Sequence, residues 1–425
     1  MIGGQRPRVA AGRGHMHKDA RASPDMRHSA FGALALTILF TAFIAAVYAF
    51  GVYLFPALIG PMREALSLSY SDVGGIMAAS QLGFLSAALA SGALTRIIGP
   101  TRLIFLSVLV CGTCLCLVPV LQDRLVLHVL LFVTGGCSAT VWVPMVVVAK
   151  AALPERHQGK ALGLMSSGTA YGIFVNGLSI PLLLPAHGWT AVWYFSAALT
   201  GLLFLAGCVF VWSGGLKTSG PEADENRVKV PLAEILTDPI ALMLLGVMLF
   251  NGISCMPTQN YLASFVSDEL QHGVAASSDI WKILGVVGMF GGFAIGVLAD
   301  MITVRRATVI TYLVLAAALA LFVHHGSLWQ MYLGAALFSL AFNAIFGLIP
   351  AYISLAFPAR LTTPLFGLGN VMLGTGAMIG NYVGGVTKDV LGSFVPVFSA
   401  NLVIALCLAL VFAVVRERAL RSAAS

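Results

Sequence analysis

Hydrophobic runs of about 20 residues recur along the whole chain, with short polar stretches between them. A run of that length crosses a hydrocarbon core of roughly 30 Å as an α-helix and is too long for a barrel strand. Because lipid leaves the backbone to satisfy its own polar groups, the pattern predicts an all-α membrane protein. About twelve spans are expected, at residues 33–59, 73–95, 102–121, 125–149, 160–185, 190–213, 239–266, 279–299, 305–323, 329–357, 364–386 and 394–415.

The chain also repeats itself at a fixed shift of 204 residues. Gly92-Ala93-Leu94 recurs as Gly296-Val297-Leu298, and Arg102 recurs as Arg306 (306 − 102 = 204). This register predicts two pseudo-symmetric six-helix halves, at residues 31–213 and 239–415. Parallel halves with a site between them are the arrangement of many secondary transporters.

Polar segments divide the chain further. Residues 214–238 carry Gly, Ser, Pro and mixed charges, which is typical of a linker between halves. Residues 1–30 are expected to be a disordered basic cytoplasmic tail, and residues 416–425 a second cytoplasmic tail.

The distribution of positive charge predicts the topology. With the N-terminus inside, only four of the 24 Lys and Arg residues fall on the outer side, namely Arg63, Arg124, Lys282 and Lys388. Both termini are therefore expected in the cytoplasm, in a multi-pass protein of a bacterial inner membrane. The net charge of +7 follows from this topology, so nucleic acid is not an expected partner. The lipid bilayer and a small-molecule substrate are the expected partners of a monomer.

Several kinds of chemistry are not indicated. The seven cysteines all fall inside predicted spans, as free thiols packed like small hydrophobic side chains would, so neither disulfides nor a metal site is expected. The sequence contains no phosphate-binding loop and no hydrolase or zinc-protease signature. We expect neither an enzyme nor a bound cofactor.

The loops after the second span of each half resemble a signature of the major facilitator superfamily, roughly G-x-L-A-D-R-x-G-R-R. The second copy, from Gly296 to Arg306, keeps the glycine, Asp300, Arg305 and Arg306. The first copy keeps Arg102 but has Arg96 where the family has the aspartate. The resemblance implies the fold of that superfamily and a carrier that works by alternating access.

Two further segments are similar to the YbfB-type and monocarboxylate/oxalate-carrier-like branches of the superfamily. They are Pro154 to Trp193 and the run Gly384-Gly385-x-x-x-Asp389-x-x-Gly392. Members of these branches move small organic anions or have no known substrate. Together with Lys282 and the scarcity of acidic residues in the spans, the similarity indicates a small organic anion such as a monocarboxylate, moved by secondary active or facilitative transport. Efflux of amphiphilic compounds is the alternative, and a membrane sensor that does not transport is a third hypothesis.

Charged residues at the cytoplasmic loops are candidates for a gate. Asp300 could pair with Arg305 or Arg306 and latch one conformation of the two halves. Arg96 cannot pair with Arg102, so the first half would need an acid from elsewhere. The alternative is that these charges only set the topology.

Glycines at four-residue steps are candidates for close helix contacts: Gly168 and Gly172 in span five, Gly288 and Gly292 in span eight, Gly376 and Gly380 in span eleven. In the superfamily fold, spans five and eight meet across the halves, as do spans two and eleven. These glycines are therefore expected on surfaces that move during transport, with static packing as the alternative.

Polar residues inside the spans are candidates for the substrate site. Lys282 and Asp279 lie three residues apart on one face of span eight, where the lysine could bind an anion or could extend to the outer interface. Five neutral candidates lie near mid-depth and could instead serve helix packing: Tyr48, Gln81, Trp142, Asn251 and Asn343. No carboxylate is expected at mid-depth and Asp279 is the one candidate for coupling, so coupling to a proton or a counter-anion stays open.

Overall fold

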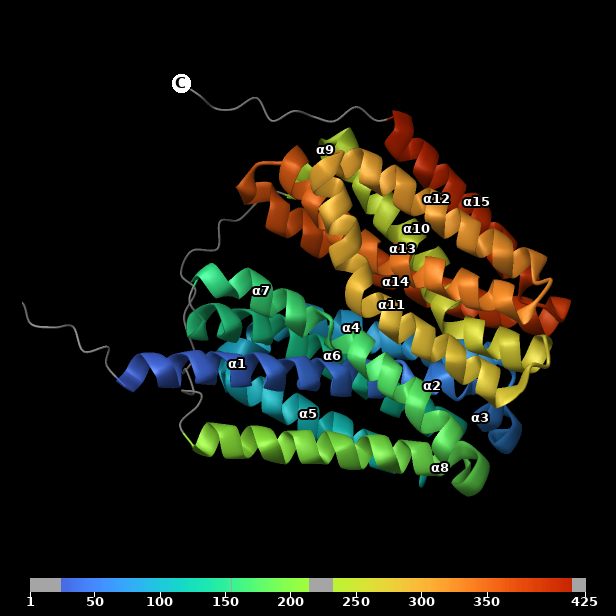
Figure 1. Ribbon diagram of the computed structural model, residues 1–425, viewed down its shortest axis with the longest axis horizontal. Helices are drawn as coiled ribbons and strands as arrows, with labels where there is room; N and C mark the ends of the chain where they lie inside the picture. The colour runs from blue at the N-terminus through green and yellow to red at the C-terminus, as the bar shows by residue number, and fades with distance from the viewer. Residues whose placement is uncertain (1–23, 154, 214–231, 415–425) are drawn as a thin grey trace, which may run out of the picture.

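The computed structural model describes residues 24–153, 155–213 and 232–414, and every regular element in these residues is a helix (Figure 1). The expected basic tail lies mostly outside the described residues, but its last part belongs to α1, which begins at Pro24. Most of the expected linker and the whole C-terminal tail also lie outside the described residues.

The first expected span, 33–59, is interrupted in the structure. Helix α1 (Pro24–Ile44) continues as a π-helical stretch η1 (Ala45–Phe50), and the chain then resumes in the short helices α2 (Leu54–Ala57) and α3 (Ile59–Leu66). Gly51 follows the π-helical stretch, where an added Cβ would lie 2.3 Å from the Val47 carbonyl oxygen. The backbone at this turn therefore leaves no room for a side chain, and π-helical turns are frequent at functional sites.

The rest of the first half consists of α4 (Tyr70–Ile98), α5 (Pro100–Leu117), α6 (Arg124–Ala152), α7 (Glu155–Ser166) and α8 (Gly168–Trp212). Helix α8 reverses direction at Gly188, whose φ of 76° is open to glycine. Figure 1 shows its two legs, which correspond to the two spans expected on either side of residue 188.

The second half begins with the short α9 (Leu232–Thr237), then α10 (Pro239–Ser264), η2 (Phe265–Glu269), α11 (Gly273–Met301) and α12 (Val304–His324). It ends with α13 (Leu328–Ala356), α14 (Ala359–Leu391) and α15 (Val395–Val414). Helix α9 packs through the buried side chain of Ile235, and its solvent-exposed Glu234 accepts two hydrogen bonds from Arg360 at 2.6 and 2.7 Å. These bonds hold the pKa of the Glu234 carboxyl below its ordinary value.

Among the described residues, ten helical segments are long and apolar enough to cross a membrane. One of them, Gln158–Trp212, contains the two legs that meet at Gly188. Helix α14 is not among the ten, but it runs the length of the bundle between α4 and α10. The ten segments, with Gln158–Trp212 counted as two crossings and α14 added, make the expected twelve crossings.

The two halves lie side by side and can be oriented by their ends (Figure 1). We call the end of the bundle where α8 finishes and α9 begins the linker end. The opposite end, which holds α2, α3 and the turn of α8 at Gly188, is the far end. Helix α1 begins and α15 (Val395–Val414) ends on the side of the linker end.

Candidate functional site

Two pairs of helices join the halves: α4 packs on α14, and α8 packs on α11. Near the far end the α4–α14 pair touches through glycines. A Cβ added to Gly385 would lie 2.1 Å from the carbonyl oxygen of Tyr70, and one added to Gly74 would lie 2.7 Å from that of Asn381. At this end the two backbones are therefore in direct contact.

The α8–α11 pair closes in the same way. A Cβ added to Gly177 would lie 2.7 Å from the backbone nitrogen of Lys282, and one added to Gly285 would lie 2.6 Å from that of Phe174. Both seams between the halves are thus tight toward the far end. The shift of 204 residues places none of these four glycines on another glycine, so the internal repeat gave no signal for them.

Polar contacts also cross between the halves at the far end. The Asp389 carboxylate accepts hydrogen bonds from the backbone nitrogens of Tyr70 (3.0 Å) and Ser71 (2.6 Å) and from the Ser71 hydroxyl (2.5 Å). The Tyr70 hydroxyl donates to Asp268 at 2.8 Å. The sequence showed Asp389 only as part of a family-like motif, because its partners lie more than 300 residues away.

An ion pair stiffens the part of the second half that receives Tyr70. Lys388 and Glu269 lie 2.7 Å apart, and both side chains are largely buried. Glu269 also accepts hydrogen bonds from the Ser393 hydroxyl (2.5 Å) and the Phe394 backbone nitrogen (2.9 Å). The start of α15 and the end of α14 are therefore tied to η2.

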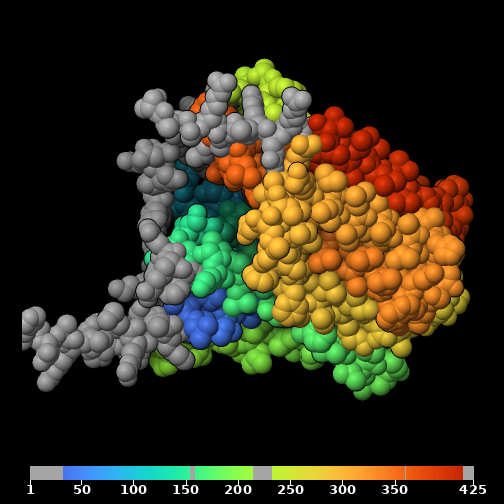
Figure 2. All heavy atoms as spheres, turned by 45° about the horizontal axis from the view of Figure 1, so that its top comes forward, coloured from blue at the N-terminus to red at the C-terminus, as the bar shows by residue number. Residues whose placement is uncertain are grey.

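The halves diverge toward the linker end. Helix α7 packs on α1, α6 and α8, all of its own half. No described atom outside the local helix lies within 4 Å of a Cβ added to Gly163, Gly296 or Gly367. Figure 2 shows the surface hollowed between the green helices of the first half and the orange helices of the second. Within the residues that the structure describes, the two halves touch toward the far end and are apart toward the linker end.

A groove opens on the linker-end part of α11 and α13. Its free volume is about 340 Å³, and small residues line most of it, including Gly292, Gly296 and Gly347. Phe293 on its wall is 78% exposed, and Asp300 lies at its linker-end limit. The linker-end half of α11 thus carries an uncovered face of small residues.

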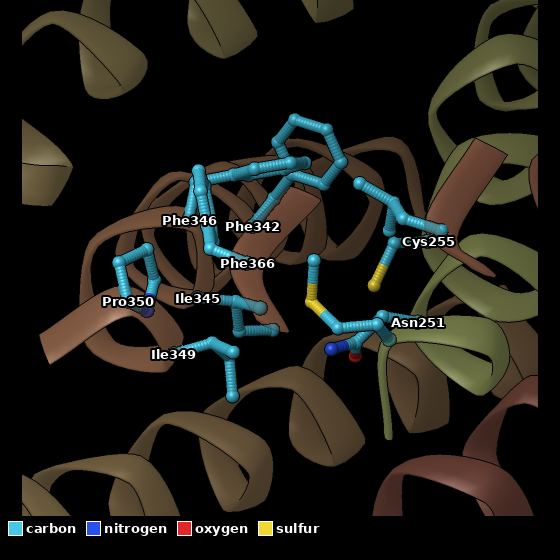
Figure 3. Close-up of a pocket in the computed structure, with 10 residues that line it drawn as sticks. Asn251, Cys255, Phe342, Ile345, Phe346, Ile349, Pro350 and Phe366 are labelled. Carbon is cyan, nitrogen blue, oxygen red and sulfur yellow. The ribbon is translucent and has the colours of Figure 1, made fainter. Parts of the chain in front are cut away.

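A second pocket lies among α10, α13 and α14 (Figure 3). Its free volume is about 10 Å³, room for roughly one water molecule. The wall is mostly aromatic and apolar, with Phe342 and Phe346 edge to face at 5.0 Å and with Phe366 from α14. Sequence reasoning missed these phenylalanines, because on an apolar helix they look like ordinary core residues.

The neutral candidates divide between the halves. Tyr48, Gln81 and Trp142 are half-buried on η1, α4 and α6, with the Tyr48 ring at the edge of Phe84. Asn251 is buried, and its amide lies 2.9 Å from the Tyr312 hydroxyl on α12. The Asn343 amide donates to the Ser339 carbonyl one turn earlier at 2.8 Å. In this conformation both amides are bonded within the second half, and Asn251 also lines the pocket of Figure 3.

Lys282 lies at the α8–α11 seam. Its ammonium pairs with Asp279, and the Tyr332 hydroxyl donates to the same carboxylate at 3.0 Å. The lysine stem rests against Gly177, and a third of its side chain stays exposed. The neighbouring Trp281 is fully buried, 6.4 Å from the ring of Tyr53 in the first half.

The gate candidates at the linker end form no ion pair among the described residues. Asp300, Arg96, Arg102 and Arg306 are exposed there. Arg305 donates its Nε–H to the Phe412 carbonyl at 2.8 Å and a second bond to Ala413. It thus satisfies carbonyls at the end of α15, a favourable place for a cation. The expected pairing of Asp300 with Arg305 or Arg306 is not formed in this conformation.

The predicted interface glycines need a correction, because four of the six pack inside their own half. Gly168 and Gly172 meet α1 and η1, while Gly376 and Gly380 meet the backbone of α10. Gly288 approaches the other half, 3.2 Å from the Cβ of Ala170, and Gly292 lies in the open groove. Glycines at four-residue spacing show that one face of a helix carries small residues, but they do not show which other helix packs on that face.

Comparison with known proteins identifies the family. The sequence model of the Major Facilitator Superfamily matches residues 41–324. The chain belongs to the major facilitator superfamily. A Haemophilus influenzae protein (strain ATCC 51907 / DSM 11121 / KW20 / Rd) named "Putative metabolite transport protein" is 25% identical over 366 residues, which span 82% of this chain and 86% of that protein.

Solved structures of the nucleoside transporter NupG have the same fold. An aspartate-to-alanine mutant of NupG superposes with a TM-score of 0.72 at 11% identity, over 90% of this chain and 99% of that one. Another NupG structure gives 0.70 at 14% identity, over 90% and 98%. The major facilitator superfamily fold and the absence of an enzymatic role agree with the sequence predictions. This member of the superfamily is a membrane transporter of a small solute.

Proposed function

We propose that this superfamily member transports its solute by alternating access and that the structure is its conformation open at the linker end. The observation that carries the proposal is the asymmetry of the two seams. Both seams are closed through glycines near the far end. At the linker end, α7 packs only on helices of its own half, and the face of α11 that carries small residues is not covered by the other half. Rocking one half against the other would exchange the open and closed ends.

We also propose that the linker end faces the cytoplasm of a bacterial cell. The excess of Lys and Arg at that end supports this orientation. Labelling of single cysteines in intact cells tests it. Cysteines at exposed Ile97 and Met301 at the linker end should react only after the membrane is opened. Labelling of these cysteines in sealed cells would show that the linker end faces outward instead.

For the solute, we propose a small organic anion such as a monocarboxylate. Lys282 supports this class, because its ammonium lies at a seam between the halves and is balanced by a single carboxylate that an anion could replace. The carboxylates of the described residues lie near helix ends, so none is placed at mid-depth to bind a cation. The aromatic side chains around the pocket of Figure 3 support the second candidate, efflux of amphiphilic compounds, which would need this pocket to widen in another conformation.

A flux assay in proteoliposomes separates these functions. The panel contains a monocarboxylate, a dicarboxylate, a nucleoside and a lipophilic cation, each measured with and without a proton gradient or a counter-anion inside. We expect uptake of a carboxylate, and we expect Lys282→Ala to reduce it at least tenfold. Lys150→Ala, which removes an exposed lysine at the linker end, is the matched control.

Other outcomes of this assay decide against the proposal. If carboxylates neither move nor compete while the lipophilic cation moves, the amphiphile function replaces the anion function. If Lys282→Ala transports normally, the lysine belongs to the outer interface. A solute that binds without flux in either direction would support the membrane sensor instead.

A further inference from the structure

The backbone N–H groups in the first turn of α4 donate to acceptors in both halves of the molecule. A helix begins with four N–H groups that lack partners within the helix. Ser69 and Asp72 form a capping box, which satisfies the N–H groups of these two residues. The N–H groups of Tyr70 and Ser71 remain, and both donate to the Asp389 carboxylate at the end of α14. The second half of the protein thus completes the cap of a helix in the first half.

The side chain of Tyr70 enters the second half at the same place. It is 5% exposed, its hydroxyl donates to Asp268, and its ring meets Phe394 edge to face at 5.1 Å. The Arg63 guanidinium covers the ring at 4.4 Å. Backbone and side chain of one residue are therefore bound by η2, α14 and the start of α15 together.

We propose that Asp389 is a positioning residue for transport, because it latches the far end shut by capping α4 from the opposite half. The proposal rests on the alternating-access function given above. A contact shifts a conformational equilibrium only if it differs between the two states. Opening of the far end separates α4 from α14, so the carboxylate loses both N–H groups and the positive end of the helix dipole. The bonds of Asp389 thus favour the state that is closed at the far end.

The latch acts on one edge of the molecule only. At the shift of 204 residues Asp389 corresponds to Pro185 (389 − 204 = 185), which has no group that could cap the start of α11. The α8–α11 seam is held at Gly177 and Gly285 by packing, whereas the α4–α14 seam is held by packing and by charge-assisted hydrogen bonds. Removal of Asp389 should therefore loosen the far end without affecting the other seam directly.

The experiment measures the two ends with pairs of spin labels on cysteines in the full chain, with exposed Cys116 and Cys407 replaced by alanine. One pair, at Glu64 and His272, reports the far end, and the other, at Ile97 and Met301, reports the linker end. Asp389→Ala is expected to raise the ratio of far-end-open to far-end-closed molecules about tenfold, with lengthening of the first distance and shortening of the second. Asp389→Asn retains one acceptor oxygen and should give a smaller shift.

Arg124→Ala is the matched control. It removes a charge at the same end, but its partner Asp72, 3.0 Å away, lies in the same half, so both distance distributions should stay as in the wild type. Unchanged distributions in Asp389→Ala would overturn the proposal, and so would an equal shift in Arg124→Ala. Tyr70→Phe, which removes only the bond to Asp268, should shift the ratio in the same direction. The distance measurements need no substrate. They can therefore contradict the role of Asp389 while the flux assay supports the transport function, or the reverse.

Discussion

Gly385 provides the sharpest test of how the far end is closed. Its backbone on α14 approaches the backbone of α4 with no room for a side chain. In Gly385→Ala the added Cβ would lie 2.1 Å from the carbonyl oxygen of Tyr70 and 3.0 Å from the Tyr261 hydroxyl. The tyrosine hydroxyl can move aside, but the carbonyl belongs to the backbone of a helix. The two helices must therefore separate at this point.

The size of the effect follows from the overlap. Ordinary contact with a Cβ begins at 3.4 Å, so the α4 and α14 backbones must part by about 1.3 Å where they touch. Overpacking of this kind costs roughly 1–3 kcal/mol. The cost applies only to the far-end-closed state, because the helices are apart in the other. At about 1.4 kcal/mol per factor of ten, the ratio of far-end-open to far-end-closed molecules should rise roughly 5-fold to 150-fold.

The spin-label pairs at Glu64–His272 and Ile97–Met301 measure this ratio directly. Gly288→Ala is a graded comparison. Its Cβ would lie 3.2 Å from Ala170 across the other seam and 3.0 Å from the amide nitrogen of Asn343 in its own half, so a smaller shift is expected. Thermal unfolding in detergent checks that each variant is folded. A folded Gly385→Ala protein with wild-type distances at both ends would refute the reasoning, because the helices would then have tolerated the side chain without opening.

Two further predictions follow from the same geometry. Gly292→Leu should leave folding intact, because a side chain has room there in this conformation. The same α11 face must be covered when the linker end closes, so the spin-label distances should shift toward the far-end-closed state and solute flux should fall. Wild-type flux would show that this face of α11 is not part of the moving surface. Arg360→Ala should leave the thermal midpoint within measurement error, since its bond to Glu234 is exposed to solvent, and a large drop would mean that α9 holds the second half together.

Much of the fold could be predicted from the pattern along the chain. The runs around residues 73–95 and 125–149 lie inside α4 and α6, because each run must bury its backbone polar groups within one helix to exist in lipid. Gly188 separates the two legs of α8, as the break between the expected spans at 160–185 and 190–213 required. The π-helical stretch and the break after it were not foreseen, because the hydrophobic run continues unbroken through Gly51, whose close backbone contact is with Val47 one turn earlier.

The sequence thus determined the membrane crossings, since length and hydrophobicity act within a few turns of chain, and its internal repeat showed the likeness of the two halves. The tertiary structure decided which residues work between the halves. Gly168 and Gly376 looked like interface residues and pack inside their own halves, while Gly385 and Asp389 meet Tyr70 across the seam. Contacts between residues hundreds of positions apart depend on how two rigid bundles are docked. That docking changes during transport, whereas the pattern along the chain stays the same.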